Sequence, residues 1–317
     1  MAVVDHDLTS MMKDRMAEDI SPTVARRRIR LALREARENA GLTQLEVAEQ
    51  MEWSSSKVIR IENGEVTIAP NDLRYLLSYL GIKDKMAVAD LLATAKIART
   101  RQRRAWYQDP KLRPHLTDAM RKLIEYEAEA TWIHSYSVFY VPGVLQLPEY
   151  STALMDAWSD ELDPDQVKYR LDARRRRHDA ALARAGELRI TALLDESVFR
   201  RLVRGPAILR AQLNELLRFI DSGLLTVRVL RFDVDVAMSY NADFDILFLG
   251  DDGDLSTAVM YRETGTSDEI LEGKGSLSGS SSPSVERHYD RYQKLWNAAD
   301  SESDTIDFIR ERIRELG

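Results

Sequence analysis

The chain has 317 residues, a length that suits two domains of ordinary size better than one. It contains no cysteine, which excludes disulfides, cysteine-ligated zinc or iron–sulfur centres and thiol catalysis, and which agrees with a reducing cytoplasm. No apolar run approaches the roughly 18 residues of a membrane span, and residues 1–20 lack the apolar centre of an export signal. We therefore expect a cytoplasmic protein without a membrane partner.

Positive charge is concentrated toward the N-terminus, although the whole chain has a formal net charge of −7. Between Thr23 and Asn39, six arginines accompany two glutamates, and a second basic stretch follows between Lys96 and Lys122. From Asp243 to the end, by contrast, there are 17 acidic and 8 basic residues. Because the sum over the chain hides this asymmetry, net acidity does not exclude a polyanionic partner.

Apolar residues at helical spacing predict an all-α, five-helix domain over residues 23–82, behind a loose arm over residues 1–22. Gly41, Gly64 and Gly81 stand where three of the helices should end. Thr43 and Glu46 have the spacing of a capping box, and Ser54 is placed to cap the next helix. The expected helices cover residues 24–40, 44–51, 55–63, 71–80 and 85–104, and the last of them lies in a helical connector over residues 83–115.

From residue 116 onward, helical and strand-like segments alternate, which predicts a multidomain chain with an α+β domain over residues 116–317. The Gly- and Ser-rich stretch 273–284 has the composition of a linker or a mobile surface loop. The expected helices cover 117–132, 148–158, 164–184, 196–204, 206–222, 285–298 and 305–316. The expected strands cover 136–141, 188–194, 224–232, 244–249 and 256–262.

The second and third expected helices, joined by a tight turn, have the pattern of a helix-turn-helix that binds double-stranded DNA. The first turn of the third helix is small and polar, as the major groove requires of a helix that meets phosphates with its unpaired amides. The alternative is that these side chains are only the solvated surface of a helical bundle. The expected DNA contacts are Gln44, Ser54, Ser55, Ser56, Lys57 and Arg60, and Arg26, Arg27, Arg28 and Arg30 are expected to add general attraction. One short helix reads few base pairs, so we expect a homodimer.

The stretch LTQLEVAEQMEWSSSKVIRIENGEV, followed by PNDLRYLLSYLGI, resembles the Cro/cI-type helix-turn-helix family, also called the xenobiotic-response-element (XRE) family. The family pattern is LTQ, an inward alanine and then S-x-x-x-I-x-x-I-E-N-G. It is matched here at Thr43, Gln44, Ala48, Ser54, Val58, Ile61, Glu62, Asn63 and Gly64. Glu52 stands where the family usually has the turn glycine, and Leu45 stands where a glutamate is common. If the turn is kept, Glu52 must adopt a positive φ at a cost of about 1 kcal/mol.

Nearly the whole chain resembles the actinomycete regulators described as antitoxin-like or WhiJ-like. The matching stretches are WSSSKVIRIENG, FYVPGVLQLPEY, ALLDESVFRRLVRGPAILRAQLNEL and LTVRVLRFD. The C-terminal domain of that family is of unknown function, and its members are often encoded beside a very small partner protein. The resemblance implies a transcriptional regulator whose C-terminal domain senses a ligand or binds a small protein encoded nearby. It leaves open an antitoxin-like role, in which sequestering the partner is the main activity and DNA binding is autoregulation.

Two features of the C-terminal domain have both a functional and a structural interpretation. Aromatic and apolar residues after a strand are typical of a ligand or partner pocket, although core packing explains them as well. These residues are Phe139, Tyr140, Pro142, Leu145 and Tyr150. The run of four arginines from Arg174 to Arg177 favours one solvated helix face over a second nucleic-acid contact or a site for an acidic partner.

The sequence shows no motif for catalysis, for a cofactor or for a metal ion. The histidines lack metal-ligand spacing, and GKGS at Gly273–Ser276 lacks the glycine spacing of a phosphate loop. The pairs Asp233/Asp235 and Asp243/Asp245 have the spacing of an acid and a base on one side of a strand, but solvation in loops is favoured. We therefore expect no enzyme, no cofactor and no metal, with turnover that depends on Asp243 as the alternative.

Overall fold

A computed structural model describes residues 21–100, 106–156, 163–235, 243–263, 268–272 and 284–317. The chain forms two compact units, which divide between residues 105 and 106. The expected arm up to residue 20 and the Gly- and Ser-rich stretch up to residue 283 lie outside the described residues. No helix within the described ranges is long and apolar enough to cross a membrane.

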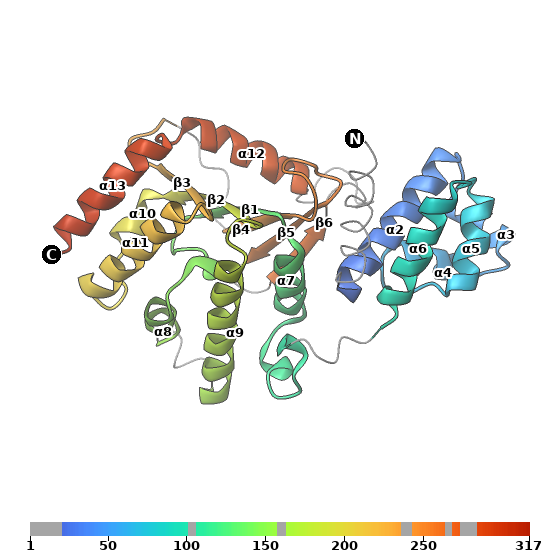
Figure 1. Cartoon of the computed structure of the whole chain (residues 1–317), viewed down its shortest axis with the longest axis horizontal. Coiled ribbons are helices and arrows are strands. Elements are labelled where there is room, and N and C mark those ends of the chain that lie inside the picture. Colours follow the sequence, from blue (N-terminus) through green and yellow to red (C-terminus); the bar gives the residue numbers. More distant parts are fainter. Residues whose placement is uncertain (1–20, 101–105, 157–162, 236–242, 264–267, 273–283) are drawn as a thin grey trace, which may run out of the picture. The chain divides into compact units, whose positions relative to one another are not determined.

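The N-terminal unit is all-α, as expected (Figure 1). Within its described residues, the helices are α2 (Pro22–Asn39), α3 (Gln44–Gln50), α4 (Ser55–Glu62), α5 (Pro70–Tyr79) and α6 (Lys85–Ala98). Their apolar stripes meet in one core, which includes Leu33, Val47, Ile61, Leu73 and Leu77. Gly41, Gly64 and Gly81 have φ values of 68°, 75° and 81°, so they end α2, α4 and α5 as the sequence predicted.

Helix α6 packs as part of the N-terminal unit, whereas the sequence assigned residues 83–115 to a connector between domains. Leu91 and Ala95 are buried in the same core as Leu33. Arg26 on α2 also donates from Nε to the Ala98 carbonyl oxygen, at 3.0 Å. Periodicity located this helix, but it could not show which helices would cover its apolar side.

The C-terminal unit is an α+β fold around one mixed sheet (Figure 1). Within the described residues, its strands are β1 (Trp132–Ser137), β2 (Arg189–Asp195), β3 (Leu225–Leu230), β4 (Phe244–Phe248), β5 (Ala258–Glu263) and β6 (Asp268–Glu272). Its α-helices there are α7 (Asp118–Glu129), α8 (Pro148–Asp156), α9 (Pro164–Ala183), α10 (Glu196–Arg200), α11 (Pro206–Asp221), α12 (Val285–Ala298) and α13 (Glu302–Glu315). Short 3₁₀ turns are η1 (Trp106–Gln108), η2 (Arg113–His115) and η3 (Gly143–Leu145). The predicted fold class is confirmed.

The strands of the described residues lie in the order β3-β2-β1-β4-β5-β6. β1, β2 and β3 are parallel to one another, whereas β4, β5 and β6 are each antiparallel to the strand before them in that order. The chain therefore builds outward from β1 through β2 to β3 and then returns to add β4 on the other side of β1. This reversal places the end of β1 beside the start of β4. The two strands are the central pair of the sheet, so these two ends meet in its middle.

The two faces of this sheet differ in chemistry, because successive residues of a strand point to opposite faces. One face carries Tyr136, Ile246, Phe248 and Met260, which form an apolar core with Tyr292 and Leu295 of α12. The other face, toward α7 and α9, carries Ser135 on β1, Asp245 on β4 and Tyr261 on β5, which are neighbours in the strand register. Polar residues thus occupy the centre of one face.

Strand β1 begins at Trp132, four residues before the expected strand 136–141. The apolar run that suggested the later start continues into a surface segment, where Phe139 and Tyr140 are exposed, while the polar His134 and Ser135 are buried in the strand. Strand β6 was not expected, because its sequence DEILE is short and charged. In the structure this strand is half-buried along its whole length.

Candidate nucleic-acid interface

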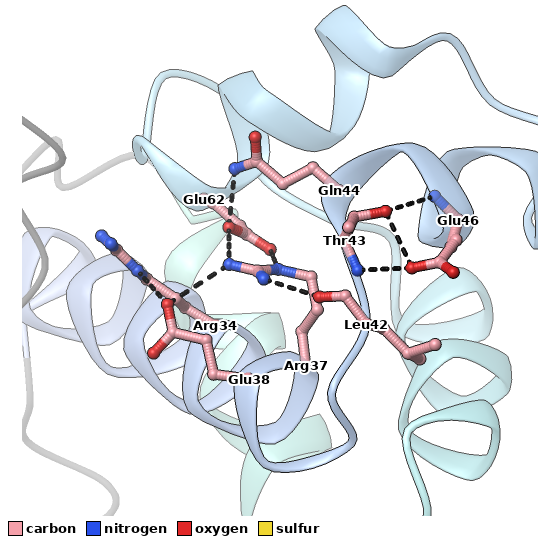
Figure 2. Close-up of polar contacts among 8 residues, drawn as sticks. All are labelled: Arg34, Arg37, Glu38, Leu42, Thr43, Gln44, Glu46 and Glu62. Atoms are coloured by element: carbon pink, nitrogen blue, oxygen red, sulfur yellow. Dashed lines mark hydrogen bonds and ion pairs between the residues drawn. The ribbon is translucent and has the colours of Figure 1, made fainter.

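The interface is built on two short helices, α3 and α4, whose starts are fixed by side chains; Figure 2 shows the start of α3. Thr43 Oγ1 accepts the Glu46 backbone N–H at 3.2 Å, and Glu46 Oε2 accepts the Thr43 backbone N–H at 2.7 Å. The hydrogen bond from the Thr43 backbone lowers the pKa of Glu46, because only the carboxylate accepts it fully. At α4, Ser54 Oγ accepts the Lys57 backbone N–H at 3.3 Å. Both predicted caps are confirmed.

The turn between α3 and α4 holds a strained residue. Glu52 has a φ of 55°, in the left-handed region that glycine adopts without steric cost. The Trp53 backbone N–H donates to the Ala48 carbonyl oxygen at 2.8 Å, which closes the turn. The prediction that Glu52 would be forced into a positive φ is confirmed, and the turn keeps its geometry without glycine.

The first turn of α4 is open to solvent. Ser54, Ser55 and Ser56 are exposed, and Lys57 is half-buried. The backbone N–H groups at a helix start lack intrahelical partners, and the helix dipole favours an anion there. Small hydroxyl side chains allow a duplex to approach these amides closely. Four of the six predicted contacts thus lie together on one surface.

The two predicted cations of α4 have acidic neighbours. Lys57 Nζ lies 3.7 Å from the centroid of the Trp53 ring and 3.5 Å from Asp72 Oδ2. Arg60 Nε lies 3.5 Å from Glu65 Oε2. The four charged side chains are 41–56% exposed, so each pair is weak and is screened by salt. DNA phosphates can therefore displace both carboxylates at low cost, while the Trp53 ring holds Lys57 in place.

Sequence reasoning missed Trp53 and Asp72 as parts of this surface. Trp53 precedes the N-cap Ser54 and lies outside α4, so helical spacing did not link it to Lys57. No local pattern pointed to Asp72, which belongs to α5.

Gln44 lies at the start of α3, but its side chain reaches toward the interior (Figure 2). Its Nε2 donates to Glu62 Oε2 at 2.8 Å. The same carboxylate accepts Arg37 Nε at 2.7 Å and Nη2 at 3.0 Å, and Arg37 Nη1 donates to the Leu42 carbonyl oxygen at 2.9 Å. Arg37 and Glu62 are both buried, and their hydrogen bond raises the pKa of Arg37. The contact of Gln44 with a phosphate stays a prediction, and the structure shows its Nε2 bound to Glu62 instead.

The arginines of α2 serve mostly within the N-terminal unit. Arg27 is buried, and Arg28 Nη2 lies 2.7 Å from Asp90 Oδ2 on α6. Arg30 packs against Gly64, where an added Cβ would come within 2.9 Å of Arg30 Cδ. Several arginines of this run thus have contacts within the N-terminal unit, where α2 packs against α4 and α6, and their general attraction for DNA stays a prediction.

The predicted pocket residues of the C-terminal unit do not share one surface. Phe139 and Tyr140 follow β1 and are 44% and 38% exposed. Pro142, Leu145 and Tyr150 are buried, and the Tyr150 hydroxyl accepts a backbone N–H of the segment after β1 at 3.4 Å. Burial raises the pKa of Tyr150 to about 12. The last three residues pack in the core, whereas Phe139 and Tyr140 remain open to a partner.

Two arginines of the run on α9 face solvent. Arg175 Nη2 and Arg176 Nε lie 2.7 and 2.8 Å from the carboxylate oxygens of Asp172, and both arginines are exposed. Their positions agree with the interpretation of the run as a solvated helix face.

The other two arginines of the run turn inward, so that interpretation is wrong for them. Arg177 is buried and donates to both carboxylate oxygens of Glu127 on α7, at 2.7 and 2.8 Å. Arg174 is half-buried and donates to Gln146 Oε1 at 2.8 Å. Positions three apart share a helix side, which explains why Arg174 and Arg177 point together toward the sheet.

Asp245 belongs to β4 and Asp243 stands just before it, and both bind residues at the end of β1, so the expectation of a solvated loop is wrong for this pair. Ser135 Oγ donates to Asp245 Oδ1 at 2.6 Å. Asp243 accepts Ser137 Oγ at 3.1 Å and the Val138 backbone N–H at 2.9 Å. Burial raises the pKa of Asp245 to about 7 and that of Asp243 to about 6. The two carboxyl groups therefore differ from ordinary surface aspartates.

Asp233 and Asp235 lie in the segment after β3 and are exposed, so the expectation of solvation is confirmed for this pair. Across the part of the chain that the structure describes, no group of three or more histidine, aspartate and glutamate side chains is placed to hold a metal ion.

Two family models match the chain, one in each unit. A model described as a helix-turn-helix domain matches residues 28–90, which include α3, the turn and α4. A model described as a domain of unknown function (DUF5753) matches residues 120–311, which include the whole sheet. No curated protein and no solved structure matches the chain. A helix-turn-helix domain thus precedes an α+β domain without an assigned activity.

Proposed function

The chain belongs to the family of the domain of unknown function DUF5753, and from that premise we propose that it is a sequence-specific DNA-binding transcriptional regulator of the Cro/cI (XRE) type. The exposed first turn of α4 is the observation that carries this proposal. There, Ser54, Ser55 and Ser56 surround the unpaired amides of the helix start, and Lys57 stands beside them. Arg60 and the backbone N–H of Gln44 extend the surface to flanking phosphates.

A homodimer follows from the small size of this surface. One short helix reaches only a few base pairs, and two half-sites about 34–36 Å apart are what helix-turn-helix dimers read. Two copies also bring the affinity into the range of about 10⁻⁸–10⁻¹¹ M that specific regulators reach. We therefore propose an operator with two-fold symmetry.

A footprint of the full chain on the DNA upstream of its own gene, at two salt concentrations, tests the proposal. The unaltered protein should protect a two-fold-symmetric site. Lys57→Ala with Arg60→Ala should abolish the protection and flatten the salt dependence of binding by about one unit for each phosphate that is no longer neutralised.

The matched control is Lys83→Ala with Lys85→Ala, which removes the same charge from exposed positions at the start of α6. It should keep the protected site. Equal binding by the two double variants would overturn the assignment of α4 as the recognition helix, and no protection by the unaltered protein at either salt concentration would overturn DNA binding at this site.

For the C-terminal unit we propose a regulatory role, in which it senses a ligand or binds a small partner protein. Three exposed aromatic side chains support binding of a protein partner. Phe139 and Tyr140 follow β1 and Phe232 follows β3, so all three lie at the end of the sheet where these parallel strands finish. In the alternative form of this proposal, the protein is antitoxin-like: it mainly sequesters the partner, and DNA binding is autoregulation.

Co-purification from the native host separates these roles. The full chain is compared with a variant that carries Phe139→Ser and Phe232→Ser. A small protein held in stoichiometric amount by the unaltered chain, and absent from the variant, supports partner binding. Absence of such a protein from both favours ligand sensing.

A further inference from the structure

Helices α7 and α9 cover one face of the sheet (Figure 1), and the strand register places polar residues at the centre of that face. A sheet usually presents apolar side chains to the helices that cover it, as the opposite face of these strands does toward α12. Here the central strands present Ser135, Ser137, Asp243, Asp245 and Tyr261 instead. Burying polar and charged groups costs free energy, so this composition indicates a function other than packing.

Arg174 enters this face without an anionic partner. Its Nη1 donates to the amide oxygen of Gln146, and within the described residues no carboxylate lies at ion-pair distance from its guanidinium. Burial lowers the pKa of Arg174, and the neighbouring charge of Arg177 lowers it further. Arg177 does not have this deficit, because Glu127 accepts two of its N–H groups. Glu263 raises the pKa of Arg174 without forming an ion pair, so what Arg174 lacks is an anion in direct contact.

Asp243 and Asp245 have the opposite deficit. Their hydrogen-bond donors are two serine hydroxyls and one backbone N–H, and neither carboxylate forms an ion pair with a lysine or arginine of the described residues. Burial raises the pKa of both groups, and the charge of Glu263 raises that of Asp243 further. A cation beside them would reverse these shifts. Arg177 lowers the pKa of Asp245 without forming an ion pair, so what the two aspartates lack is a cation in direct contact.

These groups form one cluster. The segment after β1 joins these groups: the Val138 backbone N–H donates to Asp243 at 2.9 Å, and Gln146, which accepts from Arg174 at 2.8 Å, donates to the Val141 carbonyl oxygen at 2.7 Å. The guanidinium groups of Arg174 and Arg177 both lie against η3, at 3.4 and 3.3 Å from the position of a Cβ added at Gly143. The missing anion and the missing cation thus belong to the same place in the fold.

The cluster also lies where the strand order reverses. β1 and β4 are neighbours in the sheet, although β2 and β3 come between them in the sequence and lie on the other side of β1. Open sheets bind their ligands at such a reversal, beyond the carboxyl ends of the parallel strands. Ser137, the last residue of β1, and Asp243, just before β4, occupy this position and are joined by a hydrogen bond of 3.1 Å.

We propose that this cluster binds a small zwitterion of the amino-acid type, whose carboxylate pairs with Arg174 and whose ammonium group pairs with Asp243 and Asp245. A simple anion or a simple cation would leave half of the cluster uncompensated. All three residues are half-buried rather than fully enclosed in the core. The inference rests on the proposed ligand-sensing role, and its test needs no DNA.

Saturation-transfer NMR with the full chain tests the site with three probes. Acetate carries the anion alone, methylammonium carries the cation alone, and 4-aminobutyrate carries both. We expect 4-aminobutyrate to bind more tightly than acetate, and methylammonium to bind least. Arg174→Met should abolish binding of acetate and 4-aminobutyrate. The matched control Arg175→Met, which changes the exposed neighbour, should keep both.

Asp243→Asn separates the two halves of the site and serves if Arg174→Met does not fold, as judged by circular dichroism. It should reduce the binding of 4-aminobutyrate to the level of acetate and leave acetate unchanged. The proposal is overturned if no probe binds, if acetate binds as tightly as 4-aminobutyrate, or if Arg174→Met keeps the binding. A failed footprint at α4 would leave all of these measurements intact, so the two proposals can fail independently.

Discussion

Removing one partner of the buried Arg37–Glu62 pair is expected to destabilise the N-terminal unit alone. Arg37→Met leaves the Glu62 carboxylate, whose side chain is 6% exposed, with the Gln44 amide as its remaining hydrogen-bond donor. Breaking a buried ion pair in this way costs about 3–5 kcal/mol, because an uncompensated charge stays in the interior. At about 1.4 kcal/mol for each factor of ten, the unit should open roughly 10²–10⁴ times more often.

Native-state hydrogen exchange measures this opening region by region. Peptides from α2, α3 and α4 of Arg37→Met should exchange faster by that factor, while peptides from α11 in the C-terminal unit should not change. The double variant Arg37→Met with Glu62→Leu removes both charges and should recover most of the stability. An acceleration below about tenfold, or a double variant no more stable than Arg37→Met, would refute the reasoning.

Three further substitutions test separate features. Glu52→Gly relieves the positive φ and should stabilise the N-terminal unit by about 0.5 kcal/mol, since glycine loses part of the relief through its greater entropy when unfolded. Slower hydrogen exchange in α3 and α4 checks this, and faster exchange would contradict it. Asp72→Asn removes the carboxylate that competes with phosphate for Lys57, so DNA affinity measured by fluorescence anisotropy at low salt should rise roughly two- to fivefold. An unchanged affinity would show that Asp72 does not compete. Burial raises the pKa of Asp245 to about 7, so the folded C-terminal unit binds more protons than the unfolded chain between pH 3.8 and about 7. Protonated Asp245 therefore stabilises the folded unit at low pH, and this contribution to the free energy of unfolding is lost as the pH rises through about 7. Thermal unfolding followed from acid to neutral pH should show that loss in the unaltered protein and less of it in Asp245→Asn, and equal pH dependence in both would exclude Asp245 as its source.

Most of the N-terminal unit was predictable because its signals are local. The caps at Thr43 and Ser54 and the stop at Gly64 each act within a few residues, and the structure has all three. The partners of the DNA-facing side chains are not local. Gln44 donates to a carboxylate 18 residues away, and that choice depends on how α3 packs against α4.

The C-terminal unit was predictable in its fold class but not in its polar face. β1 buries His134 and Ser135, so its sequence lacks the alternation that marks a half-buried strand. Asp245 meets Ser135 across 110 residues, a pairing that no local pattern reveals. Arg174 and Arg177 were separable from their neighbours by helical period alone, but a run of identical charges obscured that period.

The strand order has a consequence for the order in which the protein assembles during synthesis. Synthesis completes the last described helix of the N-terminal unit at residue 98. β1 lies between β2 and β4 in the sheet, so it has both neighbouring strands only once residues 244–248 have been made. Contacts between distant residues form slowly, and chains fold from the N-terminus as they leave the ribosome. The helix-turn-helix is therefore expected to be folded and able to search DNA while the sheet is still open. A newly made molecule would then pass through a stage in which its helix-turn-helix is folded and its C-terminal unit is not.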